Sequence, residues 1–131
     1  MAITHLYGLI GFPLGHSFSK KYFTEKFENL GLSKSHAYEQ FPIPTIEEFK
    51  AIITSNPNLR GLNVTIPYKQ AVMPLLDEID LAAAQIGAVN TIKIAEDGYT
   101  RGYNTDYWGF RTTVEFWDKF KNFFSLFLKH R

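Results

Sequence analysis

The run Leu6-Tyr7-Gly8-Leu9-Ile10-Gly11 is short and apolar and ends at a glycine. Such a run, bounded by a turn signal, is typical of a buried strand. The next stretch, Gly11 to Ser17, is rich in glycine and proline and is predicted to be a loop. A helix is expected after this loop, ending near Gly31. Its predicted buried face consists of Phe18, Tyr22, Phe23, Phe27 and Leu30.

A second strand and a second helix follow in the same order. His36 to Ile43 alternates in the manner of a strand, and Pro42 and Pro44 end it. Thr45 and Glu48 match a capping box, in which the acid lies three residues after the threonine. The helical stripe after this box consists of Ile46, Phe49, Ile52 and Ile53.

A third strand is predicted from Leu59 to Thr65, and Pro67 suits the first turn of a helix that runs toward Leu76. A short helix from Leu81 to Ile86 should follow, with good capping residues at its two ends, Asp80 and Gly87.

The last two predicted strands, Ala88 to Ile94 and Tyr99 to Tyr103, are joined by a turn at residues 96–98 and form a hairpin. Strands that alternate with helices indicate the α/β class. We therefore expect a three-layer domain with a mostly parallel sheet flanked by helices, one hairpin on the C-terminal side and a terminal aromatic helix.

The C-terminal tail differs in composition from the rest of the chain. The pattern is helical from Tyr107 onward, and a broad aromatic stripe runs from Phe116 to Leu128. We expect a domain over residues 1–114 and an aromatic amphipathic helix over residues 115–131. Two interpretations of the stripe stay open: the helix packs on the domain, or its exposed apolar face binds a partner or a second copy of the chain.

Composition excludes several classes of protein. The 131 residues suit one domain, and the chain has no cysteine, so disulfides, thiolate metal sites and cysteine nucleophiles are excluded. A net charge of +1 gives no footprint for nucleic acid or an anionic membrane. The start lacks a signal-peptide layout, no apolar stretch is long enough for a membrane helix, and the four histidines show no metal-ligand spacing. We expect a cytoplasmic protein with a small-molecule ligand and no metal.

Polar residues gather in loops at or just after the predicted strands, where open α/β sheets bind their ligands. Together they offer hydroxyls, amides, one lysine and one aspartate, a set that suits a polyhydroxylated small acid. Each also has a structural alternative. Ser17 or Ser19 could cap a helix, Thr65 could end a strand and Lys69 could be solvated. Asn90 could satisfy buried backbone groups, and Asp106 could cap the helix that begins at Tyr107.

Four of these loop segments resemble the signature segments of the shikimate dehydrogenase family, in the family's order: residues 11–19, 63–69, 87–91 and 104–106. The resemblance covers Tyr7 to Val114. It implies the N-terminal, substrate-binding domain of an enzyme that moves a hydride between NADP and the ring carbon of shikimate or 3-dehydroshikimate.

The resemblance assigns substrate binding to Ser17, Ser19, Thr65, Lys69, Asn90 and Asp106. The two serines would hold the carboxylate of shikimate, with Thr65 assisting near the same end. Lys69 and Asp106 would be the catalytic pair beside the reacting hydroxyl and would bind the ring hydroxyls with Asn90. Lys69 is expected to shuttle the proton, assisted by Asp106; an electrostatic and hydrogen-bonding role for Lys69 is the alternative.

No Gly-x-Gly-x-x-Gly turn occurs anywhere in the sequence, so we expect this chain to lack the NADP-binding half, to be a fragment and to be inactive alone. A quinate/shikimate dehydrogenase is one alternative, although the presence of both Ser17 and Ser19 favours shikimate. The other is a non-catalytic module that binds a small acid or self-associates through its tail.

Overall fold

The computed structural model describes residues 2–16 and 18–105. In chain order the elements of this part are β1 (His5–Gly11), α1 (Phe18–Asn29), β2 (His36–Pro42), η1 (Ile46–Glu48), α2 (Phe49–Ser55), β3 (Leu59–Val64), η2 (Met73–Leu75), β4 (Glu78–Ile79), α3 (Leu81–Ile86), β5 (Thr91–Ile94) and β6 (Thr100–Tyr103). The predicted terminal helix, its aromatic stripe and the boundary at residue 114 lie outside the described residues.

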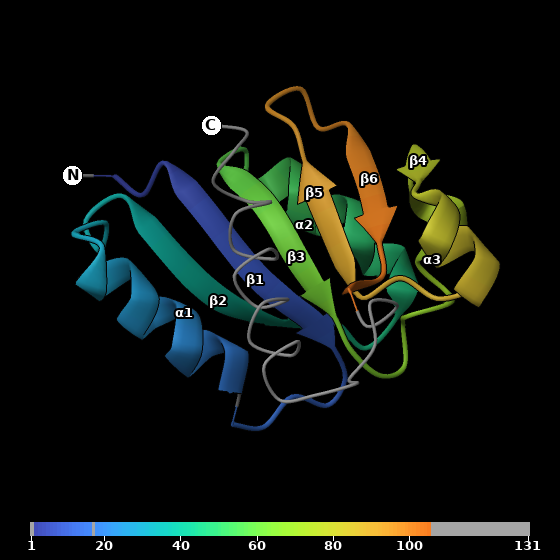
Figure 1. The fold of residues 1–131 in the computed structure, drawn as a ribbon, viewed down its shortest axis with the longest axis horizontal. Helices are drawn as coiled ribbons and strands as arrows, with labels where there is room; N and C mark the ends of the chain where they lie inside the picture. The colour runs from blue at the N-terminus through green and yellow to red at the C-terminus, as the bar shows by residue number, and fades with distance from the viewer. Residues whose placement is uncertain (1, 17, 106–131) are drawn as a thin grey trace.

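The strands form one sheet with the order β2-β1-β3-β5-β6-β4 (Figure 1). β1 pairs in parallel with β2 and β3, and β4 pairs in parallel with β6, whereas β3–β5 and β5–β6 are antiparallel. The expected mostly parallel sheet with one C-terminal-side hairpin is therefore confirmed. The short strand β4 was not predicted, because two residues are too few to show a period.

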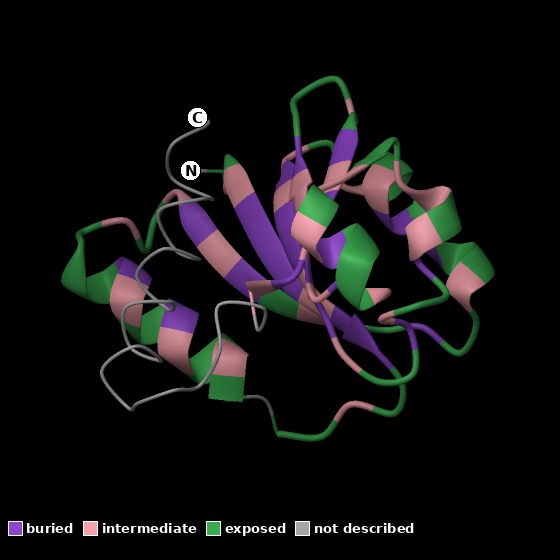
Figure 2. Ribbon diagram, turned by 45° about the vertical axis from the view of Figure 1, so that its right-hand side comes forward, coloured by how far each residue is buried: buried purple, intermediate pink, exposed green. Residues whose placement is uncertain are grey.

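Helices cover both faces of the sheet, which confirms the three-layer arrangement (Figure 2). On one face, Phe49 and Ile52 of α2 and Ala83 of α3 belong to a large aliphatic core with side chains of β1, β3 and β5. On the other face, α1 contributes Phe23 and Phe27 to a small aromatic core. Its strand partners there are Tyr7 on β1 and Tyr38 on β2.

The predicted buried face of α1 was too broad. Phe23 and Phe27 are buried, but Phe18 is 63% and Leu30 is 48% exposed. The aromatic core buries just the middle of the helix, and the ring of Phe18 at its start stacks on Tyr22, with ring centroids 6.1 Å apart. Gly31 has a positive φ of 71° and follows the end of the helix, as its position in the sequence predicted.

The predicted helix from Pro67 toward Leu76 is wrong. The chain makes turns there and one short 3-10 helix, η2. Pro74 has no N–H to donate, and its ring disfavours the α conformation of Met73, so a regular helix cannot run through this stretch. The Phe12–Pro13 and Ile66–Pro67 peptide bonds are both cis.

α3 confirms its predicted capping residues. The Asp80 side chain accepts a hydrogen bond from the backbone N–H of Ala82, and Gly87 adopts a left-handed conformation with a φ of 81°.

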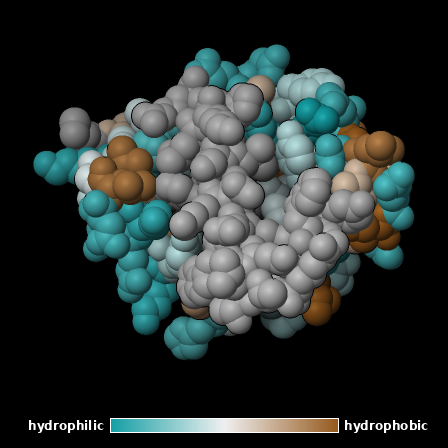
Figure 3. Space-filling view, in the orientation of Figure 1, coloured by the Kyte–Doolittle hydropathy of each residue, from teal (hydrophilic) through white to brown (hydrophobic). Residues whose placement is uncertain are grey.

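Leu81 and Ile86 of this helix are 72% and 44% exposed, and apolar surface is visible at the rim of the molecule near α3 (Figure 3). No helix among residues 2–16 and 18–105 combines the length and apolarity needed to cross a bilayer.

A hydrogen-bonded clasp joins the segment before β4 to β6. Asp77 accepts hydrogen bonds from the backbone N–H of Thr100 at 2.8 Å and from its hydroxyl at 3.0 Å, and the Thr100 hydroxyl accepts from the Asp77 N–H. These bonds hold the pKa of Asp77 below its ordinary value of 3.8. A depressed folded-state pKa stabilises the fold above the ordinary value and loses this contribution as the pH falls through the folded pKa.

Thr100→Val should therefore reduce the free energy of unfolding at pH 7 by about 1 kcal/mol, because it removes a buried hydroxyl from the clasp. The difference from the unmodified protein should shrink as the pH falls below 3.8 and through the lowered pKa of the folded Asp77 carboxyl. Urea denaturation at pH 7 and pH 3 measures both values, and an equal loss at the two pH values would contradict the role of the Asp77 carboxylate.

Candidate functional site

The candidate site lies where β1 and β3 end and β5 begins. Four backbone hydrogen bonds hold the loops of this edge together. The N–H of Thr65 donates to Ile10 at 3.0 Å, and that of Phe12 to Ile66 at 3.1 Å. The N–H of Val64 donates to Asn90, and that of Val89 to Lys69, both at 2.8 Å. Residues from three sequence segments therefore become neighbours.

Gly11 makes the closest approach between the loops after β1 and β3. A Cβ at this position would lie 2.5 Å from Cγ2 of Thr65 and 3.0 Å from the carbonyl oxygen of Ile66. No side chain fits in this space, so the glycine allows the two loops to touch. Gly11 therefore packs against both backbone and side-chain atoms of the protein.

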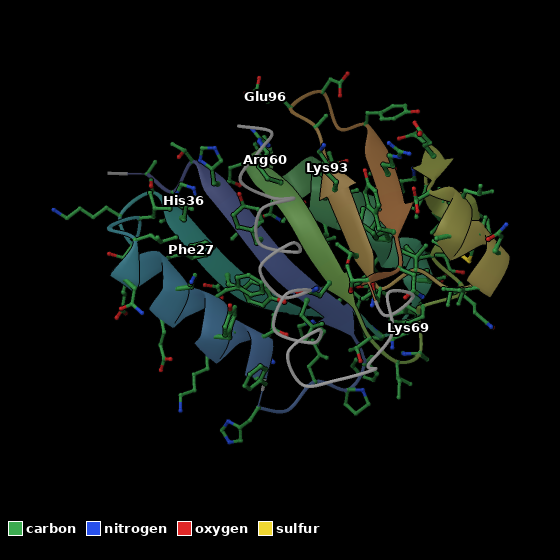
Figure 4. The ribbon with its side chains drawn as sticks, in the orientation of Figure 1. Phe27, His36, Arg60, Lys69, Lys93 and Glu96 are labelled. Atoms are coloured by element: carbon green, nitrogen blue, oxygen red, sulfur yellow. The ribbon has the colours of Figure 1, made fainter. Side chains whose placement is uncertain are left out.

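Lys69 is half-buried at this edge of the sheet (Figure 4). Its backbone is held through the bond from Val89, but within the described residues its ammonium group makes no hydrogen bond or ion pair. The side chain is therefore available to a ligand.

The side chain of Asn90 is largely engaged in hydrogen bonds inside the protein. Its Oδ1 accepts from the backbone N–H of Thr105 at 2.9 Å and from the Thr91 hydroxyl at 3.0 Å, and it lies 3.3 Å from the Thr105 hydroxyl. Its Nδ2 donates to the Thr105 hydroxyl at 3.0 Å. These bonds hold the Asn90 side chain against residue 105, and the network fixes the position of Thr105, the residue before Asp106.

Ser19 belongs to a second network, which the sequence did not reveal. It lies inside α1, so it is not the helix cap, and its hydroxyl hydrogen-bonds to that of Tyr38. The Tyr38 hydroxyl donates to Oδ1 of Asn63 at 2.5 Å. Burial raises the pKa of Tyr38 well above its ordinary value, and the hydrogen bond with Ser19 opposes this in part, so the hydroxyl stays protonated at neutral pH.

Four of the six predicted site residues can be placed. Ser19, Thr65, Lys69 and Asn90 are tied to this edge through the two networks and the loop contacts, whereas Ser17 and Asp106 lie outside the described residues. Tyr38 and Asn63 join the site unpredicted. Asn63 carried a signal, because it stands two residues before Thr65 at the end of the same strand.

A separate hollow of about 420 Å³ lies beside α1. Its lining consists of Gly15, His16, Lys20, Lys21, Thr24, Glu25 and Gln40. None of the four placed site residues is among these lining residues. The described part of the chain also contains no cluster of three side chains suited to a metal ion.

A model of a known protein family matches most of the described part of this chain. The model of the shikimate dehydrogenase substrate-binding domain matches residues 9–92. An NADP(+) shikimate dehydrogenase of Halothermothrix orenii is 42% identical over 120 residues, which cover 86% of this chain and 38% of that protein.

Two solved structures are similar in fold. A chorismate mutase/shikimate 5-dehydrogenase fusion protein of Clostridium acetobutylicum is 42% identical, with a TM-score of 0.72 over 92% of this chain and 43% of its own. A shikimate 5-dehydrogenase of Thermus thermophilus in complex with shikimate is 34% identical, with a TM-score of 0.68 over 78% of this chain and 38% of its own. The chain spans about two fifths of the length of the curated relatives it matches.

Gly11→Ala should push the loops after β1 and β3 apart and lower the free energy of unfolding by about 1–3 kcal/mol, the usual cost of overpacking. Gly15→Ala is the matched control, because a Cβ there meets nothing within 4 Å. Urea denaturation measures the stability, and the amide NMR shift of Thr65 reports the loop. Equal behaviour of the two variants would show that the contact between Gly11 and Thr65 does not hold the site.

Proposed function

Because the chain belongs to the shikimate dehydrogenase substrate-binding domain family, we propose that it is the part of an NADP-dependent shikimate dehydrogenase that binds shikimate. The observation that carries the proposal is that the loops with Thr65, Lys69 and Asn90 are joined by backbone hydrogen bonds at one edge of the sheet, to which Ser19 is linked through Tyr38 and Asn63. The proposed domain covers residues 1–114.

Hydroxyl groups bind the carboxylate of the substrate in this proposal. Ser17 and Ser19 donate to the carboxylate, and Thr65 assists from the loop after β3. The Tyr38 hydroxyl beside Ser19 is itself held by its hydrogen bond to Asn63, so this side of the proposed carboxylate site is fixed by the fold.

In this proposal, the side-chain amide of Asn90 donates a hydrogen bond to a ring hydroxyl of the ligand. Its Oδ1 is fully used by Thr91 and Thr105, and one of its two amide hydrogens is used by the Thr105 hydroxyl. One N–H therefore remains for an oxygen of the ligand.

Lys69 and Asp106 handle the proton at the reacting hydroxyl. A lysine within hydrogen-bond reach of this oxygen exchanges its proton as the oxygen changes between hydroxyl and carbonyl, and the carboxylate of Asp106 orients both groups. NADP supplies the hydride chemistry when it is bound. The sequence contains no Gly-x-Gly-x-x-Gly turn and Gly11 packs against Thr65, so these residues do not fit the cofactor and we assign it to none of them.

The proposal includes two points about the protein as a whole. The cytoplasm is its proposed location, since a chain without cysteine gains nothing from an oxidising compartment. The aromatic helix proposed for residues 115–131 offers a surface for self-association, which sedimentation of the chain over a range of concentrations would detect.

Shikimate should bind this chain weakly, with a dissociation constant on the order of millimolar, because a few hydrogen bonds must offset the translational and rotational freedom that a small ligand loses. NMR titration should shift the amide signals of Ser17, Ser19, Thr65, Lys69, Asn90 and Asp106. Quinate should bind less well, and NADP should produce no shifts.

Lys69→Ala should weaken shikimate binding about tenfold. The matched control is Lys50→Ala, which removes an exposed lysine of α2 and should leave shikimate binding unchanged. Absence of any response to shikimate would refute the binding role.

Lys69→Ala in a complete enzyme that contains this domain should lower kcat by about a hundredfold or more, because the proton loses its acceptor. Steady-state kinetics in the direction of shikimate oxidation measures the effect. Near-normal turnover of the variant would exclude Lys69 from the chemistry while leaving its binding role open to the titration above.

A further inference from the structure

Tyr68 lies directly before Lys69, and its ring is inside the large aliphatic core. The residue is 6% exposed, although it belongs to the loop after β3 and not to a helix or strand. Its hydroxyl donates to the carbonyl oxygen of Ile43 at 2.5 Å. Burial raises the pKa of Tyr68, as do the carboxylates of Glu48 and Glu47, so the hydroxyl remains a donor at neutral pH.

The bond from Tyr68 continues into the first loop of the site. The N–H of Ile43 donates to the carbonyl of Gly11 at 3.1 Å, so one peptide unit on each side of Ile43 is fixed. Gly11, Ile43 and Tyr68 thereby connect the loop after β1, the end of β2 and the loop after β3. The N–H of Tyr68 also donates to Thr65 at 3.0 Å and closes the turn between these two residues.

Within residues 2–16 and 18–105, the side chain of Lys69 has no such anchor. Its backbone is instead held on both sides, by the buried ring and hydroxyl of Tyr68 and by the bond from Val89 to the Lys69 carbonyl. The direction in which the lysine leaves the loop thus depends on these two attachments.

We propose that Tyr68 is a positioning residue for Lys69, acting through the hydrogen bond from its hydroxyl to Ile43; this inference rests on the proposed function of Lys69 as a ligand of shikimate. The ring fills the core, and the hydroxyl sets where the loop lies relative to the rest of the site. Removal of the hydroxyl leaves the Ile43 carbonyl without this partner and frees the loop to shift.

The test is a double-mutant cycle on shikimate binding with the unmodified chain, Tyr68→Phe, Lys69→Ala and the double variant. Tyr68→Phe should weaken binding about three- to tenfold when Lys69 is present and should add no further loss when Lys69 is absent. Tyr99→Phe is the matched control, because it removes a hydroxyl bonded to Glu78 on the far hairpin and should leave affinity unchanged. An equal loss in both backgrounds, or no loss, would overturn the proposal.

A second readout does not need shikimate. Reductive methylation with ¹³C-formaldehyde labels Lys69, whose resonance is identified by its disappearance in Lys69→Arg. The resonance should move or broaden in Tyr68→Phe and stay in place in Tyr99→Phe, at a temperature where thermal melts show all variants folded. If the unmodified chain does not bind shikimate, the proposed function fails and this resonance alone decides whether Tyr68 positions Lys69; an unchanged resonance would refute it.

Discussion

The parallel pairing of β1 with β3 places Ile10 beside Val64, and the loops of the candidate site meet because of this pairing. Strands that run in the same direction end at the same edge of a sheet, so the residues that follow them share one small volume. The contact between Gly11 and Thr65 exploits this closeness, because the glycine has no side chain to separate the loops. A different register between the two strands would put Thr65 and Lys69 beside other residues.

Hydrogen bonds at this edge serve two purposes. Asn90 and Tyr38 use most of their hydrogen-bonding capacity on protein partners, which fixes the side chains that surround the site. Lys69 is held through its backbone, and among the residues that the structure describes its ammonium group has no partner. Rigid surroundings with one uncommitted charged group suit the binding of a small anionic ligand, since little freedom is lost on binding.

The two cores of the domain support different side chains of the candidate site. The aromatic core under α1 holds Tyr38 against Phe23, with ring centroids 5.1 Å apart, and thereby fixes the hydroxyl that reaches Ser19 and Asn63. The larger aliphatic core receives the ring of Tyr68 and supports the loop that carries Lys69. Each face of the sheet therefore supports a different set of ligand groups at the same edge.

Local patterns explain which parts of this protein were predictable. The strand at Leu6 to Gly11, the caps of α3 and the hairpin around Gly98 each depend on residues close together in the chain, and all three are confirmed. Pro74 is a local signal against the regular helix that was predicted after Pro67. The burial of Tyr68 and its bond to Ile43 join positions 25 residues apart, so no local pattern could show them. Tyr38 and Asn63 are equally distant, so no pattern could show that they meet. The sequence by itself determines the side-chain chemistry and the periodicity of each segment. The hydrogen-bond partner of each hydroxyl and amide depends on strand register and packing, which form when distant segments fold together.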